Sequence, residues 1–130
     1  MVTFCAAGGS ISTVIHILAL AHRANVPLSL RDVDRFARHV PVIADLKPSG
    51  RWLMEDFHRA GGSRAFLHRL ASLLHGGERT VCGGTLAQRT ADAEVLDDAV
   101  IRPLEKPVAD WGRVAVLSGN LAPEGCLMRP

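Results

Sequence analysis

Tyrosine is absent from this 130-residue sequence, and cysteine occurs only three times. Cys5, Cys82 and Cys126 are far apart, odd in number and never arranged as C-x-x-C. They therefore predict neither a disulfide framework nor a zinc site built from paired ligands. We expect three free thiols in a reduced compartment, and hence a cytoplasmic location.

No block of like charge is present either. The formal net charge of +2 comes from 15 basic and 13 acidic residues, which are interleaved along the chain. This pattern gives no electrostatic footprint for nucleic acid or for a membrane surface, so we expect neither as a partner. A hydrophobic content of 48% predicts a globular protein with an internal core.

A long uninterrupted apolar run is also missing. The apolar opening stretch is split by Gly8-Gly9-Ser10, contains His16, and has no Lys or Arg before it. A secretory signal has a basic start and one unbroken apolar segment, and a membrane span needs about 20 apolar residues. The sequence therefore predicts neither.

Histidine is plentiful but lacks metal-ligand spacing. None of the six forms an H-x-x-x-H or H-E-x-x-H pair. We expect surface or hydrogen-bonded core histidines, and no metal ligands, at His16, His22, His39, His58, His68 and His75.

Hydrophobic patterning predicts the elements at the start of the chain. Residues 2–6 are a short apolar run and indicate a buried strand. We expect a turn at Gly8-Gly9 after this strand, followed by a helix that Ser10 caps. Apolar residues recur at i, i+3, i+4 and i+7 from Ile11. They predict a helix that is buried on most sides and ends near Ala24-Asn25.

The remaining elements follow from caps and turn residues. Ser29 and Asp32 have the spacing of a capping box, which predicts a helix up to Pro41. We expect further helices at 52–60, from Ser63 and after Thr85. We expect further strands at 42–44, at 79–84 together with a turn, and at 114–117 and 126–128. Proline and glycine become frequent near residue 100, where we place a change from an α/β portion to a β-rich portion.

The stretch VPVIADLKPSGRWLMEDFHRAGG (40–62) has two interpretations. Lys47, Ser49, Arg51, Glu55 and Asp56 would suit a carboxylate-binding pocket, but they would equally suit a solvated loop and helix start. Adjacent acids do not face each other on a helix, which weakens paired-carboxylate catalysis.

Gly8-Gly9-Ser10 also has two interpretations. Backbone N–H groups at a helix start can bind an anion, while a tight turn into the helix explains the same residues. The pattern is neither a P-loop nor a dinucleotide fingerprint, so it gives no support to nucleotide binding.

Several collinear stretches together resemble one enzyme family. GGSISTVIHILALAHRANVPLSLRDVDRFARHVPVIADLKPSG, DDAVIRPLEKPV and GRVAVLSGNLAPEGCLMRP are similar to the GGSTNAVLHL, DDFDRI, VIRPLDNP and GGLAVLRGNLAPDGAVVKP patterns of the dihydroxy-acid and sugar-acid dehydratases, the IlvD/Edd family. The resemblance covers nearly all of the chain. It implies an α/β fold class, with residues 1–99 as the end of an N-terminal α/β domain and 100–130 as the start of a C-terminal β-rich, barrel-like domain.

The family resemblance implies a reaction. A 2,3-dihydroxy or sugar acid loses water to give an enol, which becomes a 2-keto acid. In the full-length family an iron–sulfur cluster acts on the departing hydroxyl, Mg²⁺ holds the carboxylate end and a serine alkoxide removes the C2 proton. Such a reaction needs fixed charge at both centres. The resemblance also places Ser10, Lys47 and Ser49 at the border of the substrate site.

The sequence departs from the family in ways that predict an inactive segment. The motifs that carry the cluster cysteines, the metal ligands and the catalytic serine in relatives have no counterpart here, so we expect no catalytic, cofactor-binding or metal-binding residue on this chain. Ile11-Ser12-Thr13 replaces Thr-Asn-Ala after the GGS turn. We therefore expect an internal fragment of a hydro-lyase that is inactive alone and self-associates.

Two further expectations concern the function class. The loop around Phe57 and the compact LASLLHGGERTVCGGTL segment (70–86) are closer to the sugar-acid dehydratases than to the branched-chain enzyme. The alternatives to an enzyme fragment are a non-catalytic remnant that associates with a partner chain and an independent small binding domain.

Overall fold

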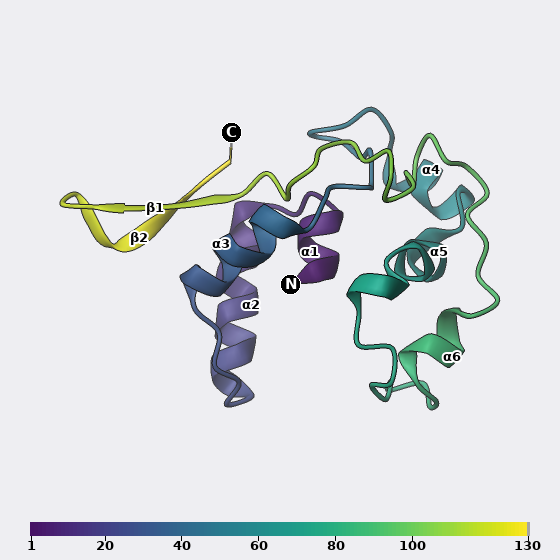
Figure 1. Cartoon of the computed structure of the whole chain (residues 1–130), viewed down its shortest axis with the longest axis horizontal. Coiled ribbons are helices and arrows are strands. Elements are labelled where there is room, and N and C mark those ends of the chain that lie inside the picture. Colours follow the sequence, from purple (N-terminus) through teal and green to yellow (C-terminus); the bar gives the residue numbers. More distant parts are fainter. Residues whose placement is uncertain (130) are drawn as a thin grey trace.

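The computed structural model describes residues 1–129 and shows a helical body from which one β-hairpin extends (Figure 1). The elements in chain order are α1 (Val2–Ala6), α2 (Ile11–Arg23), α3 (Leu30–His39), α4 (Met54–Arg59), α5 (Gly62–Arg69), a 3₁₀ turn η1 (Ala71–Leu73), α6 (Leu86–Thr90), β1 (Ala115–Gly119) and β2 (Ala122–Met128). Helices together with an antiparallel hairpin confirm a mixed α and β composition. Within residues 1–129 the only sheet has two strands, so the barrel-like domain stays a prediction.

The predicted strand at 2–6 is wrong, because these residues form helix α1. Phe4, Cys5 and Ala6 are consecutive and all buried, so a run of five residues carries no period that separates a strand from a helix. The Ala6 carbonyl accepts hydrogen bonds from the backbone N–H groups of Ile43 and Ala44. The end of α1 therefore contacts the extended segment at the centre of the molecule.

That central segment, residues 42–45, is extended but is not a regular strand. Val42 pairs with Ala109 and Ala44 with Ile101 as isolated bridges. Ile43 is fully buried, and its carbonyl accepts from the backbone N–H of Arg102 at 2.8 Å. The stretch around residues 100–109 thus packs along residues 42–45, while the proposed domain change near residue 100 stays a prediction.

Local capping signals gave the helix starts correctly. Ser10 is the N-cap of α2 and accepts from the backbone N–H of Ser12, and Thr85 caps α6 through Gln88.

The predicted strand at 79–84 is reduced to turns and a single bridge between Arg79 and Thr85.

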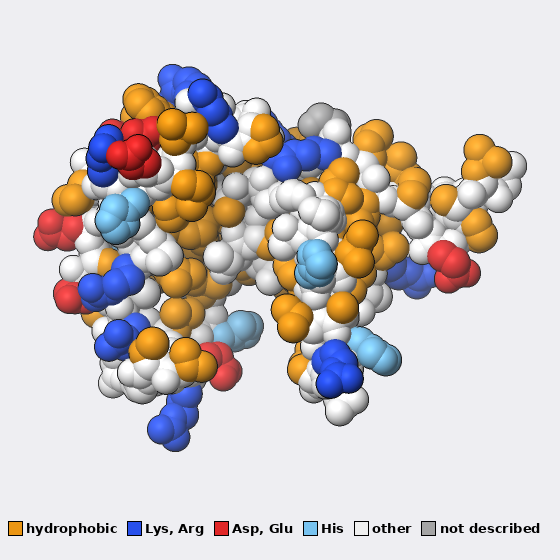
Figure 2. Space-filling view, turned by 180° about the vertical axis from the view of Figure 1, so that it is seen from behind, with side chains coloured by type: hydrophobic (Ala, Val, Ile, Leu, Met, Phe, Trp, Pro, Cys, Tyr) orange, Lys and Arg blue, Asp and Glu red, His pale blue; other side chains and the backbone are white. Residues whose placement is uncertain are grey.

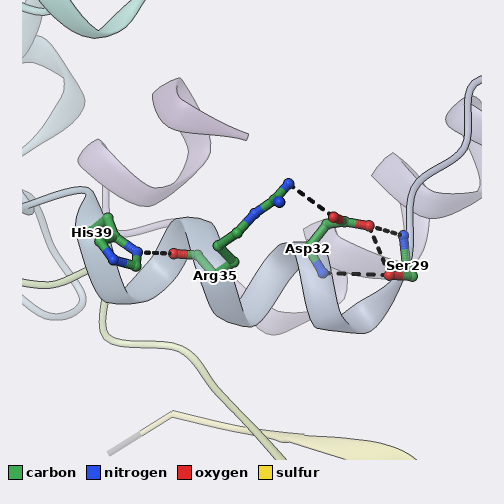
Figure 3. A network of polar contacts seen from close by, with 4 residues as sticks. All are labelled: Ser29, Asp32, Arg35 and His39. Carbon is green, nitrogen blue, oxygen red and sulfur yellow. Dashed lines mark hydrogen bonds and ion pairs between the residues drawn. The ribbon is translucent and has the colours of Figure 1, made fainter.

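Helix α3 shows the capping box that the sequence predicts (Figure 3). The Asp32 carboxylate accepts from the backbone N–H of Ser29 at 3.0 Å, and Asp32 N–H points back to the Ser29 hydroxyl at 3.4 Å. Arg35 pairs with Asp32 one turn later. Val33 and Ala37 on the opposite face are fully buried, so this helix is anchored in the core.

The prediction that helix α2 is buried on most sides is wrong. Val14 is its only fully enclosed residue, while Ile15 and Leu20 are 63% and 68% exposed. Figure 2 shows hydrophobic side chains spread over this part of the surface. Burial in this structure is instead concentrated in one cluster, whose largest enclosed members are Ile43, Leu70, Ile101, Val14, Val33, Val100, Val114 and Cys5.

Candidate functional site

Asp45 anchors the loop that carries two of the three predicted border residues. This residue is only 5% exposed, and its backbone N–H donates to the Val100 carbonyl. Its carboxylate accepts from the backbone N–H of Arg51 at 3.1 Å and from Arg51 Nε at 2.7 Å. Buried carboxylates need such partners, so the ends of the 45–51 loop are held together.

The loop tip turns tightly above this anchor. The Lys47–Pro48 peptide bond is cis, and Lys47 N–H donates to the Trp52 carbonyl at 2.8 Å. A Cβ built on Gly50 would lie 2.4 Å from the Asp45 carbonyl carbon, which leaves no room for a side chain. This geometry presents Lys47, Pro48 and Ser49 at the exposed tip.

Arg129, just after β2, connects the loop tip to the turn between α1 and α2. Its Nη1 donates to the Gly9 carbonyl at 2.9 Å, and its Nη2 donates to the Gly8 carbonyl at 2.8 Å and to Ser49 Oγ at 2.6 Å. Three segments that are distant in the sequence therefore meet at one guanidinium. The cavity beneath it measures only about 10 Å³.

The structure brings the predicted border residues into one region. Ser49 is bonded through Arg129 to the two glycines that precede Ser10. Ser10 itself is exposed, and its hydroxyl lies 2.6 Å from that of Ser12, while Lys47 is exposed at the loop tip. Their role at a substrate site stays a prediction, but their neighbourhood is consistent with it.

The other polar residues of the 40–62 stretch make local contacts. Arg51 is paired with Asp45, and Glu55 with Arg59 one turn along α4. Asp56 accepts from the backbone N–H of Leu53 at 2.9 Å. These contacts favour the helix-start interpretation for residues 51–59 and leave the loop tip as the candidate binding surface.

Sequence reasoning missed Arg129. Its partners lie 80 and about 120 positions away, beyond the reach of any local pattern. One signal was present, because Arg129 in GCLMRP occupies the place of the lysine in the family pattern GAVVKP. A basic residue shared at that place would have marked it.

The cysteines do not fit the iron–sulfur cluster that the family implies. Cys5 is fully buried in α1, and burial raises the pKa of its thiol to about 11, which keeps the sulfur protonated. Cys82 and Cys126 are exposed in a loop and on β2. In the described part of the chain, no three His, Cys, Asp or Glu residues converge as a metal site would require, so neither the cluster nor Mg²⁺ is assigned to these residues.

Residues 1–89 match the family model described as dihydroxy-acid/6-phosphogluconate dehydratase N-terminal. The chain belongs to this dehydratase family. It is 46% identical over 129 residues to the dihydroxy-acid dehydratases of Methylibium petroleiphilum and of Chloroflexus aggregans. Each alignment covers 95% of this chain and 23% of the relative, so the chain spans about a quarter of the length of these curated proteins.

These relatives bear on two expectations. The IlvD/Edd resemblance is confirmed, and it extends over nearly the whole chain. Both relatives carry the dihydroxy-acid name, so they lend no support to the expected preference for sugar acids, which stays a prediction.

Among the helices of residues 1–129, none has the length and apolar character needed to cross a membrane.

Proposed function

We propose that this chain is a segment of a hydro-lyase that converts a 2,3-dihydroxy acid to a 2-keto acid, and that it forms one border of the substrate site. The observation that carries the proposal is the 46% identity to dihydroxy-acid dehydratases over 129 collinear residues. The gathering of Ser49, Arg129 and the Gly8-Gly9 turn supports it, because these residues come from two separate family-like stretches.

The chemistry defines what this segment contributes. The C2–H and C3–O bonds break, water leaves, and the resulting enol becomes a 2-keto acid. The carboxylate keeps its negative charge throughout, so exposed Lys47 and the neighbouring loop tip suit that end of the molecule. Since the thiols do not fit a cluster, we propose that the segment binds and orients substrate and does not catalyse by itself.

A second candidate is a non-catalytic chain that associates with a partner, such as a complementary dehydratase segment. The exposed apolar residues of α2 favour this alternative, because Ile15 and Leu20 lie open to solvent. Both candidates agree with a chain that is inactive alone, and they differ in whether the segment supports catalysis when its family context is restored.

A segment exchange tests the proposal. The 129 aligned residues of the Methylibium petroleiphilum enzyme would be replaced by those of this chain, and 2-keto acid formation from a 2,3-dihydroxy acid would be measured. We expect an active chimera, whereas the 130-residue chain alone forms no product. The unmodified host enzyme is the control for assay conditions.

Two results would contradict the proposal. A soluble chimera that retains the host's cofactors at full occupancy yet forms no 2-keto acid would favour the non-catalytic candidate. Turnover of a dihydroxy or sugar acid by the isolated chain would show that it carries its own catalytic groups.

A further inference from the structure

The Ser49 hydroxyl is held in a defined hydrogen-bonding state by Arg129. A guanidinium has N–H donors and no acceptor, so the 2.6 Å contact from Arg129 Nη2 requires Ser49 Oγ to accept. The hydroxyl hydrogen is then free to donate in another direction. Ser49 is exposed at the loop tip, so this direction is open to solvent or to a ligand.

Arg129 is itself fixed by two backbone carbonyls. Gly8 and Gly9 accept from its two terminal nitrogens, and Gly8 has a left-handed backbone with φ of 63°. The planar guanidinium thereby donates to three acceptors at fixed positions. A cavity of only about 10 Å³ lies below the guanidinium.

We infer that Arg129 is a positioning residue that sets the Ser49 hydroxyl as a hydrogen-bond donor to a carboxylate oxygen of the substrate. This inference rests on the proposed function, which supplies an anionic dihydroxy acid as the ligand. The positive charge of Arg129 polarises the hydroxyl that it contacts, which strengthens donation to an anion. Lys47, two positions earlier on the same exposed tip, adds a second positive charge.

The first test uses the 130-residue chain and the smallest 2,3-dihydroxy acid, glycerate. Backbone amide shifts in residues 8–10 and 46–50 would be followed by NMR during titration, with uncharged glycerol as the control ligand. We expect saturable chemical-shift changes with glycerate and none with glycerol. Ser49→Ala should weaken binding by roughly tenfold or more, because it removes a hydrogen bond to a charged group.

Matched variants separate positioning from simple stability. Ser49→Thr keeps a hydroxyl and should retain binding, and Ser72→Ala removes an exposed serine elsewhere. Arg129→Ala should weaken glycerate binding, while Arg31→Ala, on the outer face of α3, should not. Wild-type chain without saturable shifts, or Ser49→Ala with unchanged affinity, would overturn the inference.

The second test places the same variants in the chimera. Ser49→Ala and Arg129→Ala should raise KM for the dihydroxy acid with a much smaller change in kcat, because the carboxylate contact is the same in ground and transition states. Ser49→Thr should restore KM. If the chimera is active and its KM does not change when Ser49 or Arg129 is substituted, the inference is overturned and the proposed function still stands. An inactive chimera would count against the proposed function, while the glycerate titration still decides the role of Ser49.

Discussion

Gly50 packs directly against the backbone of Asp45, at the other end of the same loop. The Asp45 backbone occupies the position that a Cβ would take, and the Asp45 carboxylate simultaneously binds Arg51. A residue with no side chain is therefore needed for steric reasons, although the φ angle of Gly50 is not positive. Proline, serine and glycine at 48–50 are residues typical of turns, but the sequence alone cannot show what this turn packs against.

Replacement of Gly50 by alanine should destabilise the fold. The added Cβ would lie 2.4 Å from the Asp45 carbonyl carbon and 2.5 Å from the Leu46 nitrogen, so the backbone must shift. Overpacking of this kind costs about 1–3 kcal/mol in the free energy of unfolding. Urea denaturation followed by circular dichroism would measure the loss.

Gly77 supplies the matched control, because a Cβ added there would meet no atom of a non-adjacent residue within 4 Å. Gly77→Ala should change the unfolding free energy by less than about 0.5 kcal/mol. Equal effects of the two substitutions would refute the packing argument at Gly50.

The elements that the sequence identified correctly are those set by local contacts. Ser10, Ser29 and Thr85 cap helices through residues two or three positions away, a range that sequence patterns cover. The misassigned run at 2–6 depends instead on burial by distant segments. Two strands near residues 114–117 and 126–128 were also correctly expected, although β1 and β2 are longer, but the attachment of β1 to α3 involves residues 82 positions apart.

Asp34 makes that attachment dependent on pH. Its carboxylate accepts from Arg38 Nε at 2.6 Å and from the backbone N–H of Val116 at 3.2 Å. The hydrogen bond from the Arg38 side chain is the main cause that lowers the pKa of the Asp34 carboxyl below its usual value. The folded state therefore binds this proton less readily than the unfolded state.

We expect the stabilising contribution of Asp34 to be complete above about pH 4, the ordinary value for aspartate. It should be lost as the pH falls through the lowered pKa of the folded state. Urea midpoints of the wild type and of Asp34→Asn, measured from about pH 7 to about pH 2, should differ most at neutral pH and converge in acid. A constant difference across the range would show that Asp34 acts without its charge.

Several large hydrophobic side chains of the molecule lie outside the core and are exposed to solvent. Ile15 and Leu20 lie open on α2, and Leu121 at the hairpin turn is 96% exposed. Figure 2 shows orange surface over the helical body and on the projecting hairpin. Within residues 1–129, the outer edge of β2 has no strand beside it, and such an edge favours pairing with other chains.

Self-association is therefore expected to depend on α2. Sedimentation velocity should show species larger than the 14.0 kDa monomer that increase with protein concentration. A double Ile15→Lys and Leu20→Glu variant should shift the distribution toward monomer, whereas Arg31→Lys should leave it unchanged. A wild-type chain that stays monomeric at all concentrations would contradict this expectation.

The contact between Arg129 and Gly8 spans 121 positions, almost the full length of the sequence. During synthesis the N-terminal turn emerges from the ribosome long before its guanidinium partner is translated. The turn and the 45–51 loop therefore cannot acquire these hydrogen bonds until Arg129 has been translated and has left the ribosome.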